Sequence, residues 1–113
     1  MKETLLSKIF PNGKSDGRGG REVNGLTANT QPANCVIVKQ APSRFPCGTD
    51  RREWYLVEVD GYHVLFRICS AMKGSGYDEF VVAHAFAESS KLEEVQYMDD
   101  FFTRQTSDVL DNE

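Results

Sequence analysis

Hydrophobic and polar residues alternate most regularly in the segment EWYLVEVDGYHVLFRIC, residues 53–69. Two alternating apolar runs flank Asp60-Gly61, a pair that favours a two-residue type I′ turn because both central residues of that turn need positive φ. The pattern therefore predicts a β-hairpin in which Val59 faces Tyr62. The register is well specified, since a slip of one residue would exchange the two faces of the hairpin.

The two faces of this predicted hairpin differ in composition. The apolar face contains Val59, Tyr62, Val57, Val64, Tyr55 and Phe66, and we expect it to be buried under a C-terminal helix. The mixed face contains Trp54, Leu56, Glu58, His63, Leu65 and Arg67. On the mixed face we expect a cation–π pair between Trp54 and Arg67. A cross-strand charge pair between Glu58 and His63 is expected beside the turn.

The N-terminal third of the chain predicts less regular structure. Residues 3–10 favour a short amphipathic helix, which Pro11 ends, with an apolar stripe made of Leu5, Leu6, Ile9 and Phe10. Residues 11–33 are rich in glycine and polar residues and predict a flexible loop, with only a weak apolar period at residues 22–26. A β-branched strand, CVIVK, begins at Cys35.

Three further segments follow the hairpin. Residues 70–78 predict a glycine-containing loop, and EFVVAHAFA, residues 79–87, predicts a returning strand. A capping-box pattern at residues 90–93 begins a helix that ends near Arg104, with an apolar stripe made of Leu92, Val95, Met98, Phe101 and Phe102. Residues 105–113 predict an acidic, frayed tail.

This order of elements predicts the α+β class. We expect residues 1–113 to form a single domain, because a chain of this length supplies one modest core. Its expected parts are a short N-terminal helix, an antiparallel β-meander of three to five strands, and a C-terminal helix packed on one sheet face.

Composition narrows the classes of function. The net charge of −4 disfavours nonspecific nucleic-acid binding, although a local basic patch is conceivable at Arg44, Arg51, Arg52 and Arg67. No apolar run approaches the roughly 18 residues that cross a bilayer, and the charged start predicts no secretory signal. Three cysteines without CxxC spacing predict reduced thiols in the cytoplasm.

Motifs for catalysis and metal binding are weak in this chain. The GKS within PNGKSDGRGG lacks the upstream glycine and the strand-to-helix context of a P-loop. His63 and His84 are too few for a metal site without further ligands at suitable spacing. We therefore expect no catalytic residue, no metal and no cofactor.

Two segments, WYLVEVDGYHVLFRI and FVVAHAFAESSKLEEVQYMDDFF, together resemble the C-terminal half of HigB/RelE-type toxins. The resemblance implies a sheet face that cleaves ribosome-bound messenger RNA. His63 and Arg67 would occupy the sheet positions of that family. His84 and Phe86 would occupy its His-x-Phe positions, although this chain continues with an alanine and a glutamate where the family has lysines.

These features favour a small, soluble, non-enzymatic protein that binds a macromolecular partner through the mixed face. The expected partner is a protein, and the acidic net charge suits a basic one such as a nucleic-acid-handling enzyme. The corresponding role would be that of an inhibitor or accessory factor of a mobile element. A HigB/RelE-type ribonuclease and a small-ligand binding domain are the alternatives, and a homodimer is left open. If both sheet faces are covered, the mixed face becomes a second core layer. The partner surface would then lie on the exposed side of the helix from Lys91 to Arg104.

Overall fold

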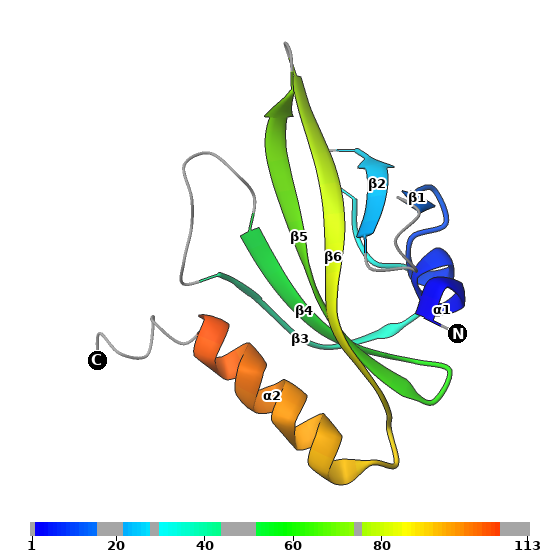
Figure 1. The fold of residues 1–113 in the computed structure, drawn as a ribbon, viewed down its shortest axis with the longest axis vertical. Coiled ribbons are helices and arrows are strands. Elements are labelled where there is room, and N and C mark those ends of the chain that lie inside the picture. Colours follow the sequence, from blue (N-terminus) through cyan, green and yellow to red (C-terminus); the bar gives the residue numbers. More distant parts are fainter. Residues whose placement is uncertain (1, 16–21, 28–29, 44–51, 74–75, 107–113) are drawn as a thin grey trace.

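In the computed structural model of this protein, residues 2–15, 22–27, 30–43, 52–73 and 76–106 are described. Within them, two helices and six strands follow one another along the chain (Figure 1). They are α1 (Lys2–Ile9), β1 (Lys14–Ser15), β2 (Glu22–Leu26), β3 (Val36–Pro42), β4 (Arg52–Val59), β5 (Tyr62–Lys73), β6 (Gly76–Glu88) and α2 (Leu92–Thr106).

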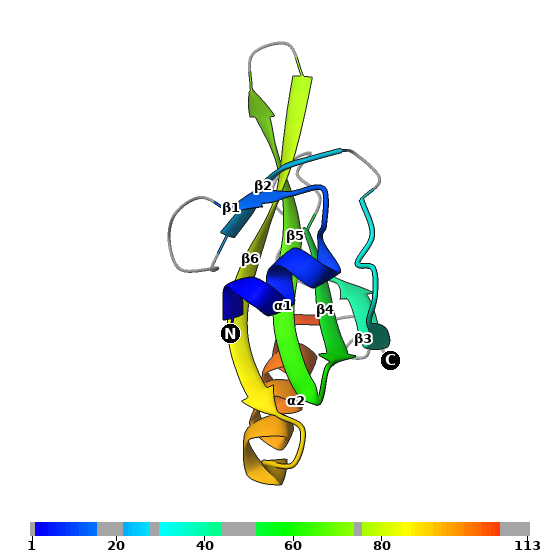
Figure 2. The ribbon, with the colours of Figure 1, turned by 90° about the vertical axis from the view of Figure 1, so that its right-hand side faces the viewer.

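All of these strands belong to one antiparallel sheet with the order β1-β2-β6-β5-β4-β3. The four strands β3 to β6 form the predicted meander, each pairing with the next. The β1–β2 hairpin extends the sheet beyond β6. Figure 2 shows α1 in front of the sheet and α2 behind its lower end. The α+β class is therefore confirmed, with the C-terminal helix packed on one face.

The central hairpin has the predicted register. Val59 pairs with Tyr62, and the ladder continues outward to the pair of Trp54 with Arg67. Asp60 and Gly61 both have positive φ, 53° and 81°. The turn chemistry alone therefore placed two strands correctly, because a two-residue turn leaves no freedom of register.

The apolar face of this hairpin is buried under α1, and the expectation that the C-terminal helix covers it is wrong. The stripe of α1 packs against this face, and all of its residues are buried: Leu5, Leu6, Ile9 and Phe10. The ring of Phe10 meets the ring of Phe66 edge-on at 5.3 Å, and Phe66 stacks on Tyr55. A helix of two turns is stable here because it buries four large side chains against the sheet.

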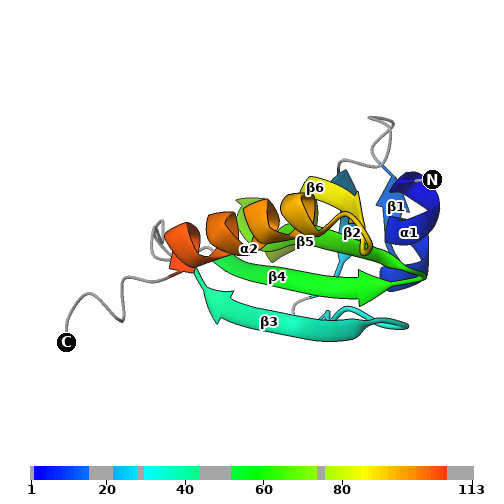
Figure 3. The ribbon, with the colours of Figure 1, turned by 90° about the horizontal axis from the view of Figure 1, so that it is seen from below.

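The mixed face instead lies under α2 and forms a second core. Its buried members are Trp54, Leu56, Leu65, Ala87, Met98 and Phe102. Of the predicted helix stripe, Met98 and Phe102 are buried, whereas Leu92 at the start of the helix is 76% exposed. Figure 3 shows α2 running along this face of the sheet. Both faces of the central strands are thus covered by helices.

Two predicted loops contain strands. Within residues 11–33, predicted as a Gly-rich loop, β2 pairs with β6 and buries Val23 and Leu26. The weak apolar period at residues 22–26 therefore corresponds to a strand. The loop prediction for residues 70–78 is wrong at both ends: residues 70–73 belong to β5, which continues to Lys73, and residues 76–78 belong to β6, which begins at Gly76. The predicted tail lies outside the described residues beyond Thr106. Neither described helix is long and apolar enough to span a membrane.

Candidate functional site

The six residues predicted for partner binding divide into two groups in the structure. Trp54, Leu56 and Leu65 are buried beneath α2 and are not accessible to a partner. Glu58 is exposed, and His63 and Arg67 are half-buried. The mixed face is therefore not a continuous contact surface, because α2 covers its apolar centre.

His63 has a local structural contact beside the turn. Its Nδ1 atom lies 2.8 Å from the hydroxyl oxygen of Ser89, which follows β6. The backbone N–H of Ser89 also donates to the carbonyl of Gly61 at 2.8 Å. The two hydrogen bonds tie the end of β6 to the hairpin turn and so set where α2 begins.

A hollow of about 270 Å³ lies between α2 and β6. Strand β6 lines it with Ala85, Phe86 and Ala87, and α2 lines it with Glu93, Glu94, Tyr97 and Met98. Ala87 and Met98 are buried and form an apolar floor, while Tyr97 is 61% exposed at the rim. Tyrosine presents a large apolar ring with a polar tip, a combination common at protein interfaces.

A second hollow, of about 260 Å³, adjoins the first and shares Phe86, Ala87 and Glu94 with it. It lies toward α1, and its other lining residues are Leu5, Tyr62, Glu88 and Lys91. We call the two hollows together the acidic groove. The carboxylates of Glu88, Glu93 and Glu94 are exposed around it, and Lys91 is the only cation among its lining residues.

An aromatic–cation cluster lies toward the other end of α2. It consists of Trp54, Arg67, His84, Phe101 and Arg104. The ring of Trp54 is 4.7 Å from the ring of His84 and 5.6 Å from that of Phe101. The predicted cation–π pair is present, with the Arg67 guanidinium carbon 5.6 Å from the Trp54 ring centre. Arg104 stands over Phe101 at 5.6 Å.

His84 joins this cluster through a change of face in β6. The pairing between β5 and β6 shifts register between Leu65 and Phe66, so that Leu65 faces Ala85 and Phe66 faces Ala83. His84 contacts Trp54 on the α2 face, whereas Phe86 packs against the α1 core. A β-bulge breaks the alternation of side chains, and this signal is not visible in the sequence. The two His-x-Phe residues therefore lie on opposite faces.

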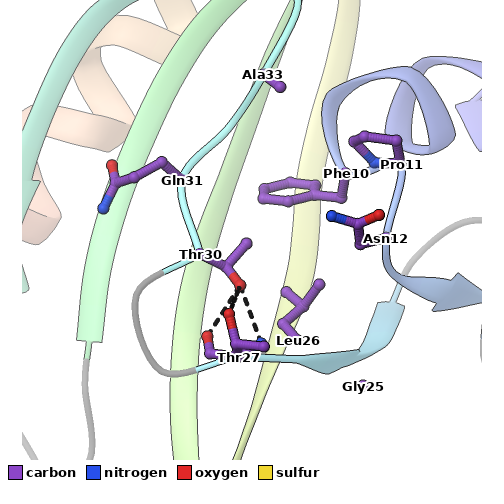
Figure 4. A pocket seen from close by; sticks show the side chains of 9 residues that line it. All are labelled: Phe10, Pro11, Asn12, Gly25, Leu26, Thr27, Thr30, Gln31 and Ala33. Atoms are coloured by element: carbon purple, nitrogen blue, oxygen red, sulfur yellow. Dashed lines mark hydrogen bonds between the residues drawn. The ribbon is translucent and has the colours of Figure 1, made fainter.

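A third hollow, of about 210 Å³, lies between the end of α1 and β2 (Figure 4). Phe10 and Leu26 provide its apolar wall. The Thr30 hydroxyl accepts a hydrogen bond from the Thr27 backbone N–H at 3.0 Å and lies 2.9 Å from the Thr27 carbonyl, to which it donates. These contacts close a turn, and none of the nine lining residues is ionisable. This hollow is explained as part of the loop packing.

The outer edge of the sheet at β3 is apolar and exposed, with Val36 at 64%. Ile37 and Val38 beside it are also exposed. The pairing of β3 with β4 shifts register between Ile37 and Lys39, which marks a bulge. Bulges interrupt the regular ladder and reduce pairing with another chain, so this edge is protected in the usual way.

No group of three or more histidine, cysteine or acidic side chains within the described ranges is arranged to hold a metal ion. Cys69 is buried and Cys35 is half-buried. Burial raises the pKa of the Cys35 thiol above its ordinary value, because the charged thiolate is poorly solvated there. Cys47, Arg44 and Arg51 lie outside the described residues.

Comparison with known proteins finds no matching family model, no matching curated protein and no matching solved structure. The sequence analysis placed the partner surface on the exposed side of the helix from Lys91 to Arg104 in the case that both sheet faces are covered. It did not identify Phe86 as a groove residue, because the position of α2 against β6 is a tertiary feature.

Proposed function

We propose that this protein is a non-enzymatic binding protein whose acidic groove takes a basic segment of a partner protein. The observation that carries the proposal is the combination of an apolar floor with a carboxylate rim. Met98 and Ala87 form the floor, and Tyr97 stands exposed beside it. Interface hot spots commonly have this arrangement, in which a large anchor enters a dry pocket and polar groups surround it.

Charge complementarity selects a basic partner. Three exposed carboxylates and one lysine line the groove, and the chain as a whole carries a net charge of −4. Such a surface attracts a cationic segment during diffusional encounter and repels the phosphates of nucleic acid. Proteins that handle nucleic acid carry basic surfaces, so a nucleic-acid-handling enzyme is the partner class that we propose. Inhibition or support of such an enzyme, as by a factor of a mobile element, is the corresponding role.

The size of the groove suits a short segment of chain. Its two hollows, of about 270 and 260 Å³, adjoin through Phe86, Ala87 and Glu94. Each volume accommodates one large apolar side chain with room for water. A segment with two apolar anchors and flanking lysines or arginines would fill both hollows and neutralise the rim.

Labelled peptides test this proposal directly. One set would carry two leucine or phenylalanine anchors flanked by lysine and arginine, and a matched set would replace each basic residue with glutamate. Fluorescence anisotropy should show saturable binding of the basic set only. Glu94→Lys, which changes a residue of both hollows, should weaken binding at least about tenfold, equivalent to ~1.4 kcal/mol.

Asp100→Lys provides the matched control. Asp100 is exposed on the same helix and lines neither hollow. Its substitution by lysine changes the net charge by the same amount as Glu94→Lys. Tyr97→Ala should weaken binding without any change of charge. Equal effects of Glu94→Lys and Asp100→Lys would indicate unspecific attraction. That result, or the failure of every basic peptide to bind, would refute the groove as the site.

A further inference from the structure

Tyr97 differs from the other aromatic residues of α2 in having no cation over its ring. The Arg104 guanidinium carbon lies 5.6 Å from the ring centre of Phe101, and the Lys39 Nζ atom lies 6.0 Å from that of Phe102. Among the described residues, the Tyr97 side chain has no cation, ring or hydrogen-bond partner. It is 61% exposed and lines the first hollow of the acidic groove, of about 270 Å³. The face of this ring is therefore open to a cation from outside the chain.

Two carboxylates lie beside this ring. Glu93 and Glu94 precede Tyr97 by four and three residues, a spacing that places all three side chains on one face of the helix, and all three line the first hollow. Both carboxylates are exposed, and neither forms an ion pair or side-chain hydrogen bond within the described part of the chain. Acidic residues in the first turn stabilise a helix through its dipole, which accounts for the two charges. The dipole gives no reason for an exposed tyrosine beside them.

The combination of an aromatic face, adjacent carboxylates and an apolar floor matches arginine better than lysine. A guanidinium is planar and weakly hydrated, so it can stack on an aromatic ring while it donates two parallel hydrogen bonds to a carboxylate. An ammonium is a compact, strongly hydrated point charge and gains less from either contact. The methylene groups of an arginine would lie on Met98 and Ala87, which are buried and form the floor.

We infer that the basic residue of the partner at the first hollow is an arginine, and that Tyr97 determines the preference for arginine over lysine. This inference rests on the proposed function and specifies the chemistry of its ligand. The guanidinium stacks on the Tyr97 ring and binds the carboxylate of Glu93 or Glu94. The second hollow does not offer the same site, because Lys91 lines it and its tyrosine, Tyr62, packs against the core under α1.

Two versions of the basic peptide test the preference. They share the same apolar anchors, and every basic position is arginine in one version and lysine in the other, so that length and charge are equal. In fluorescence anisotropy, the wild-type protein should bind the arginine version at least about fivefold more tightly, as expected for an added cation–π contact at an exposed site. In NMR spectra of the bound peptide, the arginine methylene protons should shift upfield because they lie over an aromatic ring.

Variants of the exposed tyrosine assign the preference to its ring. Tyr97→Phe keeps the ring and should keep the ratio of the two affinities. Tyr97→Leu keeps an apolar side chain without a ring, so the ratio should fall to about one and the upfield shift should disappear. Glu93→Gln should also reduce the ratio, whereas Asp100→Asn removes the same charge from an exposed position outside both hollows and should leave the ratio unchanged.

The outcomes separate this inference from the proposed function. Equal affinity of the two versions for the wild type would overturn the arginine preference and leave the groove as a site for basic segments of either kind. An unchanged ratio in Tyr97→Leu would overturn it as well, because the preference would then arise at another residue. Failure of both versions to bind would refute the proposed function and this inference together.

Discussion

Substitution of Met98 by alanine tests whether α2 packs on the Trp54 face of the sheet. Met98 is 1% exposed and belongs to the second core together with Trp54 and Leu65. Its removal deletes buried apolar atoms and leaves a space that the sheet, held by strand pairing, fills only in part. Substitutions of this kind cost about 2–5 kcal/mol of unfolding free energy.

Urea denaturation measures this loss. With a slope of about 2 kcal/mol per molar urea, a loss of ~3 kcal/mol lowers the midpoint by about 1.5 M. Trp54, the only tryptophan, lies in the same core, so its fluorescence reports the detachment of α2. Far-UV circular dichroism reports the whole sheet, and coincident transitions would show that α2 and the sheet unfold together.

Leu92→Ala is the matched control, since it removes a similar apolar volume from the same helix at a position that is 76% exposed. It should change the midpoint little, within ~0.5 kcal/mol. Equal effects of Met98→Ala and Leu92→Ala would refute the packing of α2 against this face. The positions of both the acidic groove and the aromatic–cation cluster would then be wrong.

Three further results are expected. Gly61→Val should destabilise the fold by at least about 1 kcal/mol in thermal melts and Gly61→Asn by less, because an added Cβ meets nothing within 4 Å and only the positive φ of this residue opposes a side chain. An unchanged melting temperature for Gly61→Val would contradict the turn. Gly13→Ala should cost about 1–3 kcal/mol in urea denaturation, because its Cβ would clash with the Val23 side chain on β2; an unchanged stability would contradict the close packing of Gly13 against β2. Induced expression of the wild type in bacteria should not arrest growth, and arrest with messenger cleavage would favour the HigB/RelE-type ribonuclease over the binding protein.

Local chemistry in the sequence determined the central hairpin and both helices. Asp60-Gly61 requires positive φ at two residues, and this requirement sets the turn and the pairing of Trp54 with Arg67 without reference to the rest of the molecule. Apolar stripes of helical period likewise located α1 and α2 to within two residues at each end. Such features depend on residues close together in the chain, so they can be recognised from sequence.

Tertiary structure decided which helix covers which face. Periodicity shows that a face needs burial, but the hydrophobic effect is non-directional and does not specify the covering element. Both faces of the hairpin are rich enough in apolar side chains to accept a helix. The observed choice puts Trp54 under α2 and leaves Glu94 and Tyr97 at the surface, so it also determines which residues are available for binding.

Two further features depend on how the strands pair in the folded sheet. The short segment of β2 became a strand because β6 offered an edge for pairing and a place to bury Val23. The bulge between β5 and β6 placed His84 beside Trp54 and left Phe86 at the acidic groove. Sequence patterning specified the elements of this protein, whereas the acidic groove and the aromatic–cation cluster arise where separate elements pack against one another. Those contacts depend on the packing of the whole sheet.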